Sequence, residues 1–91
     1  MSEPTPTVRV YTRRWCGYCY AARRLLTKLE IDFEEIPLDG KSEIRRSLSE
    51  ANNHWSTLPM IFIGDRFVGG YTELARIHRR GQLEPLLEGS S

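Results

Sequence analysis

The chain contains two cysteines, Cys16 and Cys19, separated by two residues. A β-branched and aromatic run at residues 8–11 predicts a buried strand before them, and apolar residues at helical spacing predict a helix that starts close to Cys16. A helix N-terminus carries free backbone N–H groups and partial positive charge, which favour the thiolate form of a cysteine. We therefore predict that Cys16 attacks a disulfide and that Cys19 resolves the mixed disulfide that forms.

This cysteine pair has two alternative interpretations. A structural disulfide across so short a loop would constrain the unfolded chain little, so stability alone is a poor reason for it. A zinc site needs four ligands, and the only other candidates, His54 and His78, lack the close-paired spacing of such sites. Arg13 and Arg14 add positive charge on the approach to Cys16, in the same direction as the helix end. The redox interpretation is therefore favoured.

Length and composition limit the class of protein. A chain of 91 residues with 40% hydrophobic residues predicts a single domain, residues 1–91, with one modest core. The formal net charge is +1 and the 13 lysines and arginines are dispersed, so no nucleic-acid partner is expected. Residues 1–7 show no signal peptide, and no segment approaches the roughly 18 apolar residues of a membrane span. We expect a cytoplasmic protein without a membrane partner, with residues 1–6 and 89–91 as disordered ends.

The first half of the chain predicts a strand-helix-strand unit followed by a second helix. Residues 33–37 form the second strand, and the helix that precedes it requires this strand to run parallel to the first. Ser42 is expected to cap the second helix, and Asn52-Asn53 is expected to end it.

The second half predicts a hairpin and a third helix. Residues 60–63 and 66–68 are two short strands that flank the turn pair Gly64-Asp65. Thr72 is expected to cap the third helix and Gly81 to end it, after which a leucine-rich tail covers the core. The predicted order is β-α-β-α-β-β-α with a four-stranded mixed sheet, an α/β protein.

This order, with Cys-x-x-Cys at the first strand-to-helix junction, resembles the thioredoxin fold, and three motifs narrow the resemblance to the glutaredoxin family. Cys16-Gly17-Tyr18-Cys19 is similar to the dithiol centre, and Thr57-Leu58-Pro59 is similar to the family's Thr-x-Pro. Residues 69–74, Gly-Gly-Tyr-Thr-Glu-Leu, are similar to its Gly-Gly-x-x-x-Leu. The resemblance covers roughly residues 7–88.

The resemblance implies a glutathione site beside Cys16. In relatives the proline that corresponds to Pro59 is cis and faces the catalytic cysteine, and the backbone at the position of Leu58 pairs with the cysteine of glutathione. The residues that it implies as glutathione contacts are Arg13, Tyr18, Arg45, Thr57, Leu58, Pro59, Gly70, Tyr71 and Thr72.

The start of the third helix is implied to hold the γ-glutamyl carboxylate. Gly69-Gly70 would let the chain turn closely, and the backbone N–H groups of Tyr71 and Thr72 with the Thr72 hydroxyl would bind the anion. Where relatives often have Asp or Ser, Thr72 supplies a hydroxyl but no charge for the glutathione amine. A lower affinity for glutathione is expected.

Arginines are implied to bind the glycine carboxylate of glutathione. Arg13 stands where relatives often carry Lys, and Arg45 aligns with a Gln or Arg used similarly. Arg46 is a substitute for Arg45, because residues 52–56 are one position longer than usual. Trp15 has two interpretations: packing at the strand end, or contact with a partner.

The resemblance implies a glutathione-disulfide oxidoreductase that is monomeric. The Cys16 thiolate would attack the glutathione-linked sulfur of a mixed disulfide and become glutathionylated, and a second glutathione would regenerate it. With protein disulfides Cys16 would form the mixed disulfide and Cys19 would resolve it. The partners are therefore glutathione and proteins with glutathionylated or disulfide-bonded cysteines, and no metal is needed.

Two further functions are implied by the same motif. Gly17 replaces the commoner proline, and among relatives a non-proline residue there goes with a [2Fe-2S] cluster between two subunits. Cys16 would then be a cluster ligand, with glutathione, in a dimer that acts as a carrier or sensor. A mycoredoxin-like protein would share the Cys-Gly-Tyr-Cys centre but use another small thiol, whereas residues 69–72 favour glutathione.

Overall fold

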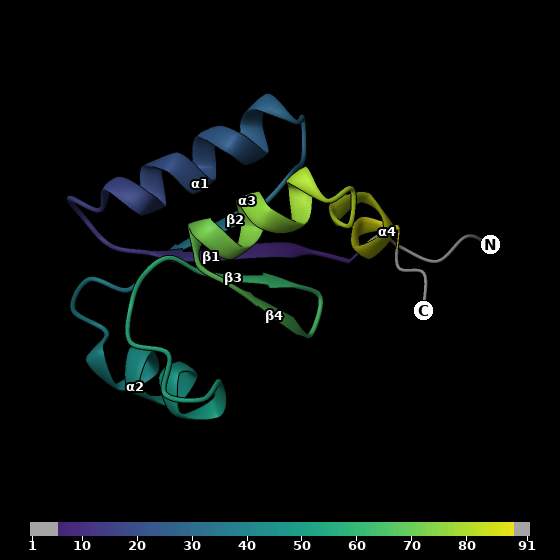
Figure 1. The fold of residues 1–91 in the computed structure, drawn as a ribbon. Coiled ribbons are helices and arrows are strands. Elements are labelled where there is room, and N and C mark those ends of the chain that lie inside the picture. The colour runs from purple at the N-terminus through teal and green to yellow at the C-terminus, as the bar shows by residue number, and fades with distance from the viewer. Residues whose placement is uncertain (1–5, 89–91) are drawn as a thin grey trace.

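The computed structural model describes residues 6–88, in which four strands and four helices follow one another along the chain (Figure 1). The strands are β1 (Val8–Thr12), β2 (Glu34–Pro37), β3 (Met60–Ile63) and β4 (Arg66–Gly69). The helices are α1 (Gly17–Lys28), α2 (Ser42–Ala51), α3 (Tyr71–Arg79) and α4 (Leu83–Leu87). The sheet has the order β2-β1-β3-β4, with β1 parallel to β2 and both other pairs antiparallel. This confirms the predicted α/β order and the mixed sheet.

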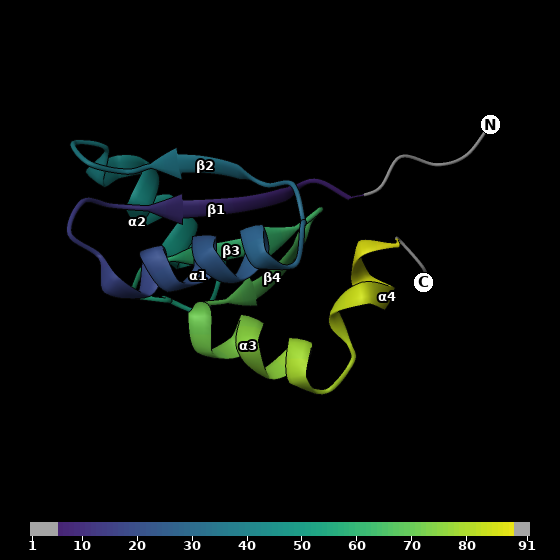
Figure 2. The ribbon, with the colours of Figure 1, turned by 90° about the horizontal axis from the view of Figure 1, so that it is seen from above.

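Helices α1 and α3 cover one face of the sheet and α2 covers the other (Figures 1 and 2). Since successive strand residues point to opposite faces, the sheet separates two apolar clusters. The cluster beneath α1 and α3 contains Val8, Val10, Ala22, Leu26, Ile61, Ile63, Leu74 and Leu83. The second cluster, against which Leu48 of α2 packs, contains Tyr11, Cys19, Leu38, Leu58, Met60 and Phe62. The core therefore holds Cys19 and Leu58 in fixed positions.

Three loops meet at one end of the strands, where β1 and β4 finish and β3 begins. Strand β3 runs antiparallel to β1 and to β4, so its start lies beside the ends of both neighbours. Tyr11 near the end of β1 pairs with Met60, and Gly69 at the end of β4 pairs with Ile61. The segments that follow β1, precede β3 and follow β4 therefore converge, although they are distant in the sequence.

The helix C-termini were predicted from the sequence more accurately than the helix N-termini. Asn52 ends α2, and Gly81 at φ +70° ends α3, both as predicted. The predicted caps are wrong: α2 already includes Ser42, with Lys41 at the cap position, and α3 has Gly70 rather than Thr72 there. At α3 the Glu73 carboxylate accepts the Gly70 N–H at 2.9 Å, so the chain enters the helix before a Thr72 cap is needed.

The ends predicted to be disordered, residues 1–6 and 89–91, lie outside the described range except for Pro6. Within that range no helix combines the length and apolar character needed to cross a membrane. The assignment of residues 1–91 to a single domain stays a prediction.

A substitution at Leu26 tests how much the cluster beneath α1 contributes to stability and leaves the cysteine segment unchanged. Its side chain is 1% exposed, so Leu26→Ala should lower the free energy of unfolding by about 2–5 kcal/mol through lost burial and a residual cavity. Urea denaturation followed by circular dichroism measures the change. The neighbouring exposed Thr27→Ala is the control and should stay within about 0.5 kcal/mol of the original protein. Equal losses for the two variants would contradict the described core.

Candidate active site

Cys16 is the N-cap residue of α1. Its backbone is extended (φ −113°, ψ 105°), and its carbonyl accepts the Tyr20 N–H at 3.1 Å as the first bond of the helix. Its Sγ accepts the Cys19 N–H at 3.2 Å, in the position that an N-cap oxygen usually takes. The free end of α1 therefore points at this sulfur, and the local field favours a thiolate there.

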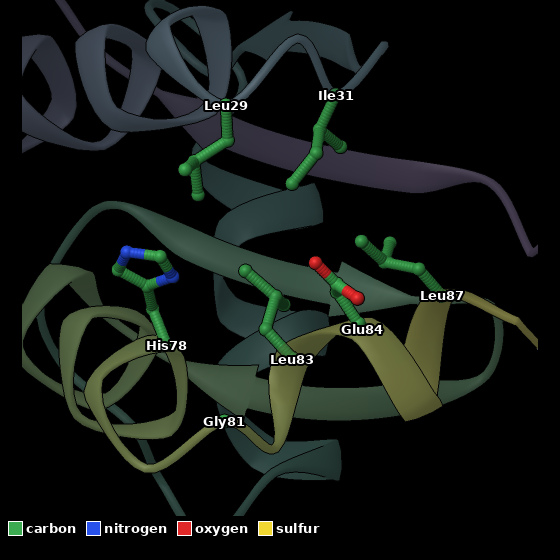
Figure 3. A pocket seen from close by; sticks show the side chains of 7 residues that line it. All are labelled: Leu29, Ile31, His78, Gly81, Leu83, Glu84 and Leu87. Carbon is green, nitrogen blue, oxygen red and sulfur yellow. The ribbon is translucent and has the colours of Figure 1, made fainter.

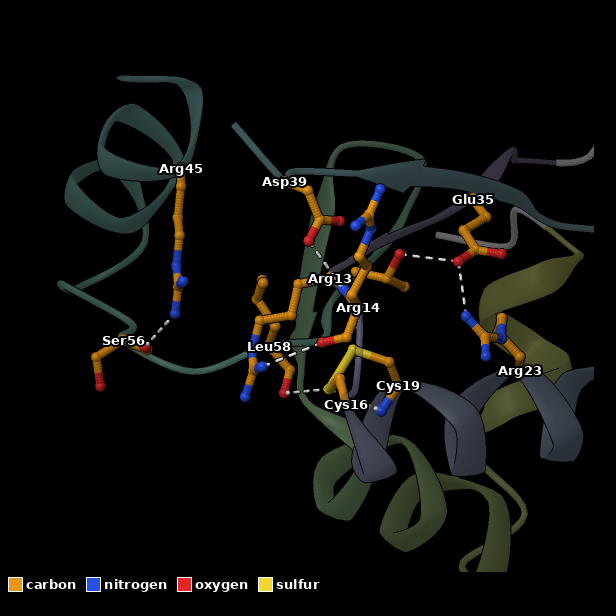
Figure 4. Close-up of a disulfide and its surroundings, with 11 residues drawn as sticks. Arg13, Arg14, Cys16, Cys19, Arg23, Glu35, Asp39, Arg45, Ser56 and Leu58 are labelled. Carbon is orange, nitrogen blue, oxygen red and sulfur yellow. Dashed lines mark hydrogen bonds and ion pairs between the residues drawn. A yellow bond between two sulfur atoms is a disulfide. The ribbon is translucent and has the colours of Figure 1, made fainter. Parts of the chain in front are cut away.

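Cys16 and Cys19 form a disulfide with 5.2 Å between their Cα atoms (Figure 4). Cys16 is half-buried, whereas Cys19 is 0% exposed and belongs to the second apolar cluster. An incoming sulfur can therefore reach Cys16 but not Cys19. This difference supports the predicted division between an attacking and a resolving cysteine.

The loop between β1 and α1 is held by contacts from the β2 side. The Arg14 N–H donates to Asp39 Oδ1 at 3.1 Å (Figure 4). The Glu35 carboxylate accepts both the Thr12 hydroxyl at 2.8 Å and the Arg23 guanidinium at 2.7 Å. These bonds fix the end of β1 and the first turns of α1, and so they fix Cys16 between them.

Trp15 lies on this loop and points outward. Its side chain is 94% exposed, so the interpretation of Trp15 as strand-end packing is wrong. Its φ is +55°, a conformation that bulky residues rarely adopt.

Gly17, the residue after Cys16, has open space around it. A Cβ built on Gly17 would have no atom within 4 Å, so a lack of space does not require glycine at this position.

A groove of about 260 Å³ lies beside the cysteine pair and contains seven of the nine residues predicted to bind glutathione. It is lined by Tyr18, Trp55, Thr57, Leu58, Pro59, Gly70, Tyr71, Thr72 and Glu73. The Leu58–Pro59 bond is cis, as the resemblance implied, and the Leu58 carbonyl oxygen lies 3.6 Å from Cys16 Sγ. The Tyr18 and Tyr71 rings stack with centroids 6.3 Å apart and join α1 to the start of α3.

The predicted arginines do not line this groove. Arg13 is exposed, and its guanidinium donates to the Arg14 carbonyl at 3.2 Å. Arg45 extends from α2 to the Ser56 carbonyl at 3.1 Å, next to the groove residue Thr57 (Figure 4). Arg46 is exposed and makes no side-chain hydrogen bond among residues 6–88. Of the two α2 candidates, Arg45 is the one directed toward the site.

Two groove residues, Trp55 and Glu73, are absent from the sequence-based prediction. The Trp55 ring packs edge-on against Phe67, and its buried Nε1–H has no acceptor in the described part of the chain. No motif marks this tryptophan. Glu73 was detectable, because an acidic residue three positions after Gly70 has the capping-box spacing, and its carboxylate makes that contact.

A second cavity, of about 340 Å³, lies at the other end of α1 (Figure 3). It is lined by Leu29, Ile31, His78, Gly81, Leu83, Glu84 and Leu87. It contains neither cysteine. The described residues likewise hold no group of three or more His, Cys, Asp and Glu side chains that could bind a metal ion. The 340 Å³ cavity is therefore separate from the cysteine pair.

Fold and site together define a thiol-disulfide oxidoreductase with the thioredoxin fold, and comparison with known proteins agrees. Residues 8–68 match the family model described as Glutaredoxin, and the chain belongs to the glutaredoxin family. Glutaredoxin of Pseudomonas aeruginosa is 43% identical over 82 residues, which cover 90% of this chain and 96% of that protein. Glutaredoxin 3 of Escherichia coli is 36% identical over 81 residues, 89% of this chain and 96% of that protein.

Solved structures show the same relationship. The solution structure of glutaredoxin from Brucella melitensis has a TM-score of 0.84 at 34% identity and covers 98% of this chain and 96% of that one. The crystal structure of the buckwheat glutaredoxin-glutathione complex has a TM-score of 0.83 at 30% identity and covers 90% of this chain and 76% of that one. The predicted thioredoxin fold is confirmed.

Gly69 fixes the turn that brings α3 to the groove. Its φ is +122°, and a Cβ there would lie 2.8 Å from Glu73 Cγ, so Gly69→Ala should cost about 2–4 kcal/mol of unfolding free energy. Gly81→Ala is the matched control, because Gly81 is also at positive φ but has nothing within 4 Å. It should cost only about 1–2 kcal/mol. Urea denaturation compares them, and an equal loss for both variants would contradict a steric role for Glu73.

Proposed function

We propose that this glutaredoxin uses glutathione to reduce mixed disulfides and protein disulfides. The observation that carries the proposal is the groove that joins the cis Leu58–Pro59 segment to the start of α3, with Cys16 Sγ 3.6 Å from the Leu58 carbonyl oxygen. Glutathione is the ligand in the related buckwheat complex, which supports the choice of thiol. The further proposed contacts are Tyr18 and Thr57, which line the groove, and Arg13 and Arg45, which lie outside its lining.

The groove offers partners for each part of glutathione. The Leu58 backbone can pair with the cysteine of glutathione, while the first N–H groups of α3, at Tyr71 and Thr72, can bind the γ-glutamyl carboxylate. Thr72 carries no charge, but the adjacent Glu73 carboxylate also lines the groove. Glu73 therefore supplies the negative charge for the glutathione amine that Thr72 lacks.

With a glutathionylated substrate the reaction needs Cys16 alone. The Cys16 thiolate attacks the glutathione sulfur, the bond between that sulfur and the substrate sulfur breaks, and the substrate leaves as a thiolate that water protonates. The thiolate of a second glutathione then attacks the glutathione sulfur on Cys16. Cys16 leaves as a thiolate and glutathione disulfide forms, so the substrate is reduced and glutathione is oxidised.

With a protein disulfide both cysteines take part. Cys16 attacks one substrate sulfur, the substrate disulfide breaks, and the second substrate sulfur leaves as a thiolate. Cys19 then attacks Cys16 Sγ, releases the reduced substrate and closes the Cys16–Cys19 disulfide present in the structure. Two glutathione molecules reduce this disulfide again and form glutathione disulfide.

Single Cys-to-Ser variants separate the two routes. Cys16→Ser should abolish both reactions, whereas Cys19→Ser should keep reduction of the glutathione–2-mercaptoethanol mixed disulfide and lose most turnover of a protein disulfide. Turnover is followed as NADPH oxidation coupled through glutathione reductase. Activity that survives Cys16→Ser would overturn the assignment. Turnover with another small thiol but not with glutathione would favour the mycoredoxin-like alternative.

Arg45 and Arg46 form a matched pair for the glycine carboxylate contact. Arg45→Ala should raise the KM for glutathione by at least about tenfold with little change in kcat, because a hydrogen bond to a charged group contributes about 1.5–3 kcal/mol. Arg46→Ala removes the same charge one residue along α2 and should leave KM within about twofold. Steady-state kinetics with varied glutathione measures both. A larger effect of Arg46→Ala would assign the contact to Arg46.

The [2Fe-2S] alternative stays a prediction from the sequence. Cys16 could contribute one thiolate ligand, but the described residues of one chain contain no larger set of metal-binding side chains. A full ligand set would require a second chain and two glutathione molecules.

A further inference from the structure

The outer face of α1 continues from the attacking cysteine. Each step of four residues advances a little more than one helical turn, about 400°, so Tyr20, Arg24 and Lys28 follow Cys16 as an oblique row along α1. Tyr20, Arg24, Thr27 and Lys28, here called the α1 stripe, are all exposed and line a shallow groove of about 440 Å³ together with Arg23. The stripe therefore lies open beside a substrate held at Cys16.

The α1 stripe is positively charged. Helix α1 contains no Asp or Glu. Arg23 is neutralised by Glu35, but within residues 6–88 neither Arg24 nor Lys28 forms an ion pair. The Arg24 guanidinium instead donates to the Tyr20 hydroxyl at 3.3 Å, which links the exposed ring to the charge. Two cations are therefore available to carboxylates of a partner.

This stripe is separate from the glutathione groove. Tyr18 lines the groove and stacks on Tyr71, whereas Tyr20 lies two residues further along α1, about 200° around the helix axis. Tyr20 is 56% exposed and is absent from the groove lining. Contacts on the α1 stripe therefore leave the proposed glutathione contacts unaltered.

Trp15 extends the surface past the cysteine. The Trp15 side chain is 94% exposed and its backbone has a φ of +55°. Both features are unfavourable, because a large apolar ring is left in water and the residue adopts a sparsely populated backbone conformation. Exposed tryptophan and arginine are the residues that dominate protein interfaces. Trp15 stands immediately before Cys16, where the residues around a partner's disulfide must lie.

We propose that Trp15 and the α1 stripe dock protein substrates whose reactive cysteine is flanked by acidic residues, an inference that rests on the proposed function. Arg24 and Lys28 lie about 12 and 18 Å along α1 from Cys16 at 1.5 Å per residue. An extended partner chain covers these distances in roughly four and five residues. The partner therefore carries Asp or Glu at those distances from its cysteine, and its apolar neighbours pack on Trp15.

Two glutathionylated peptides with a single cysteine test the surface. One carries Glu at the fourth and fifth positions on either side of the cysteine, and the other carries Lys there. The original protein should show about five- to tenfold higher kcat/KM for the acidic peptide at low salt, and the difference should shrink as salt increases. Arg24→Glu with Lys28→Glu should abolish or reverse the preference.

Further variants separate docking from chemistry. Trp15→Ala should lower kcat/KM for both peptides several-fold, Trp15→Phe should largely restore it, and neither should change turnover of the glutathione–2-mercaptoethanol mixed disulfide. Arg66→Glu with Arg80→Glu makes the same charge change at exposed positions on β4 and after α3, and should keep the preference.

The outcomes distinguish the two proposals. Turnover of the small mixed disulfide with equal kcat/KM for the two peptides would overturn the docking surface alone. A peptide preference that persists in the Arg24→Glu, Lys28→Glu variant would do the same. Failure of the original protein to turn over the small mixed disulfide would contradict the proposed function, and with it the inference that rests on it.

Discussion

The structure depends on the placement of one sulfur at the free end of a helix. Cys16 caps α1, and its Sγ accepts the Cys19 N–H, so the helix satisfies one of its unpaired donors with the reactive atom itself. The same geometry sets the two cysteines one turn apart, with Cys16 half-buried and Cys19 fully in the core. Local structure and reactivity are therefore produced by the same few bonds.

Antiparallel pairing of β3 explains how distant motifs reach that sulfur. Leu58 lies 42 positions from Cys16, yet its carbonyl oxygen approaches within 3.6 Å because β3 starts where β1 ends. The end of β4 lies at the same edge and directs α3 toward the site. The segments that line the groove come from this end of the strands and from the start of α1. The second cavity lies at the other end of α1 and contains neither cysteine.

The parts of the fold that could be predicted are those with a repeated pattern or a conformational signal. The strands around residues 8 and 60 and the Gly81 helix end follow from spacing and turn chemistry. The groove residues of the Leu58–Pro59 and Gly70–Thr72 segments were instead implied by the resemblance of their motifs to the glutaredoxin family. The Thr72 cap was wrong because a competing contact, Glu73 with the Gly70 N–H, decides where α3 starts. The Ser42 cap was wrong by one residue, because α2 starts at Ser42 after Lys41, which makes no side-chain cap contact. Trp55 carries no local signal, since only tertiary packing brings it into the groove.

Exposure of the residues beside the cysteines could not be predicted either, and it changes what the site can recognise. A tryptophan at a strand end is as compatible with packing as with contact, and only its 94% exposure distinguishes the two. Tyr18 and Tyr20, close in sequence, face different surroundings because a helix turns about 200° over two residues. Under the proposed function one face binds a small thiol of fixed shape, while the α1 stripe is exposed to protein chains of varied sequence. Since specificity is a difference of affinities, residues on the open face can alter the choice of protein substrate without altering the small thiol.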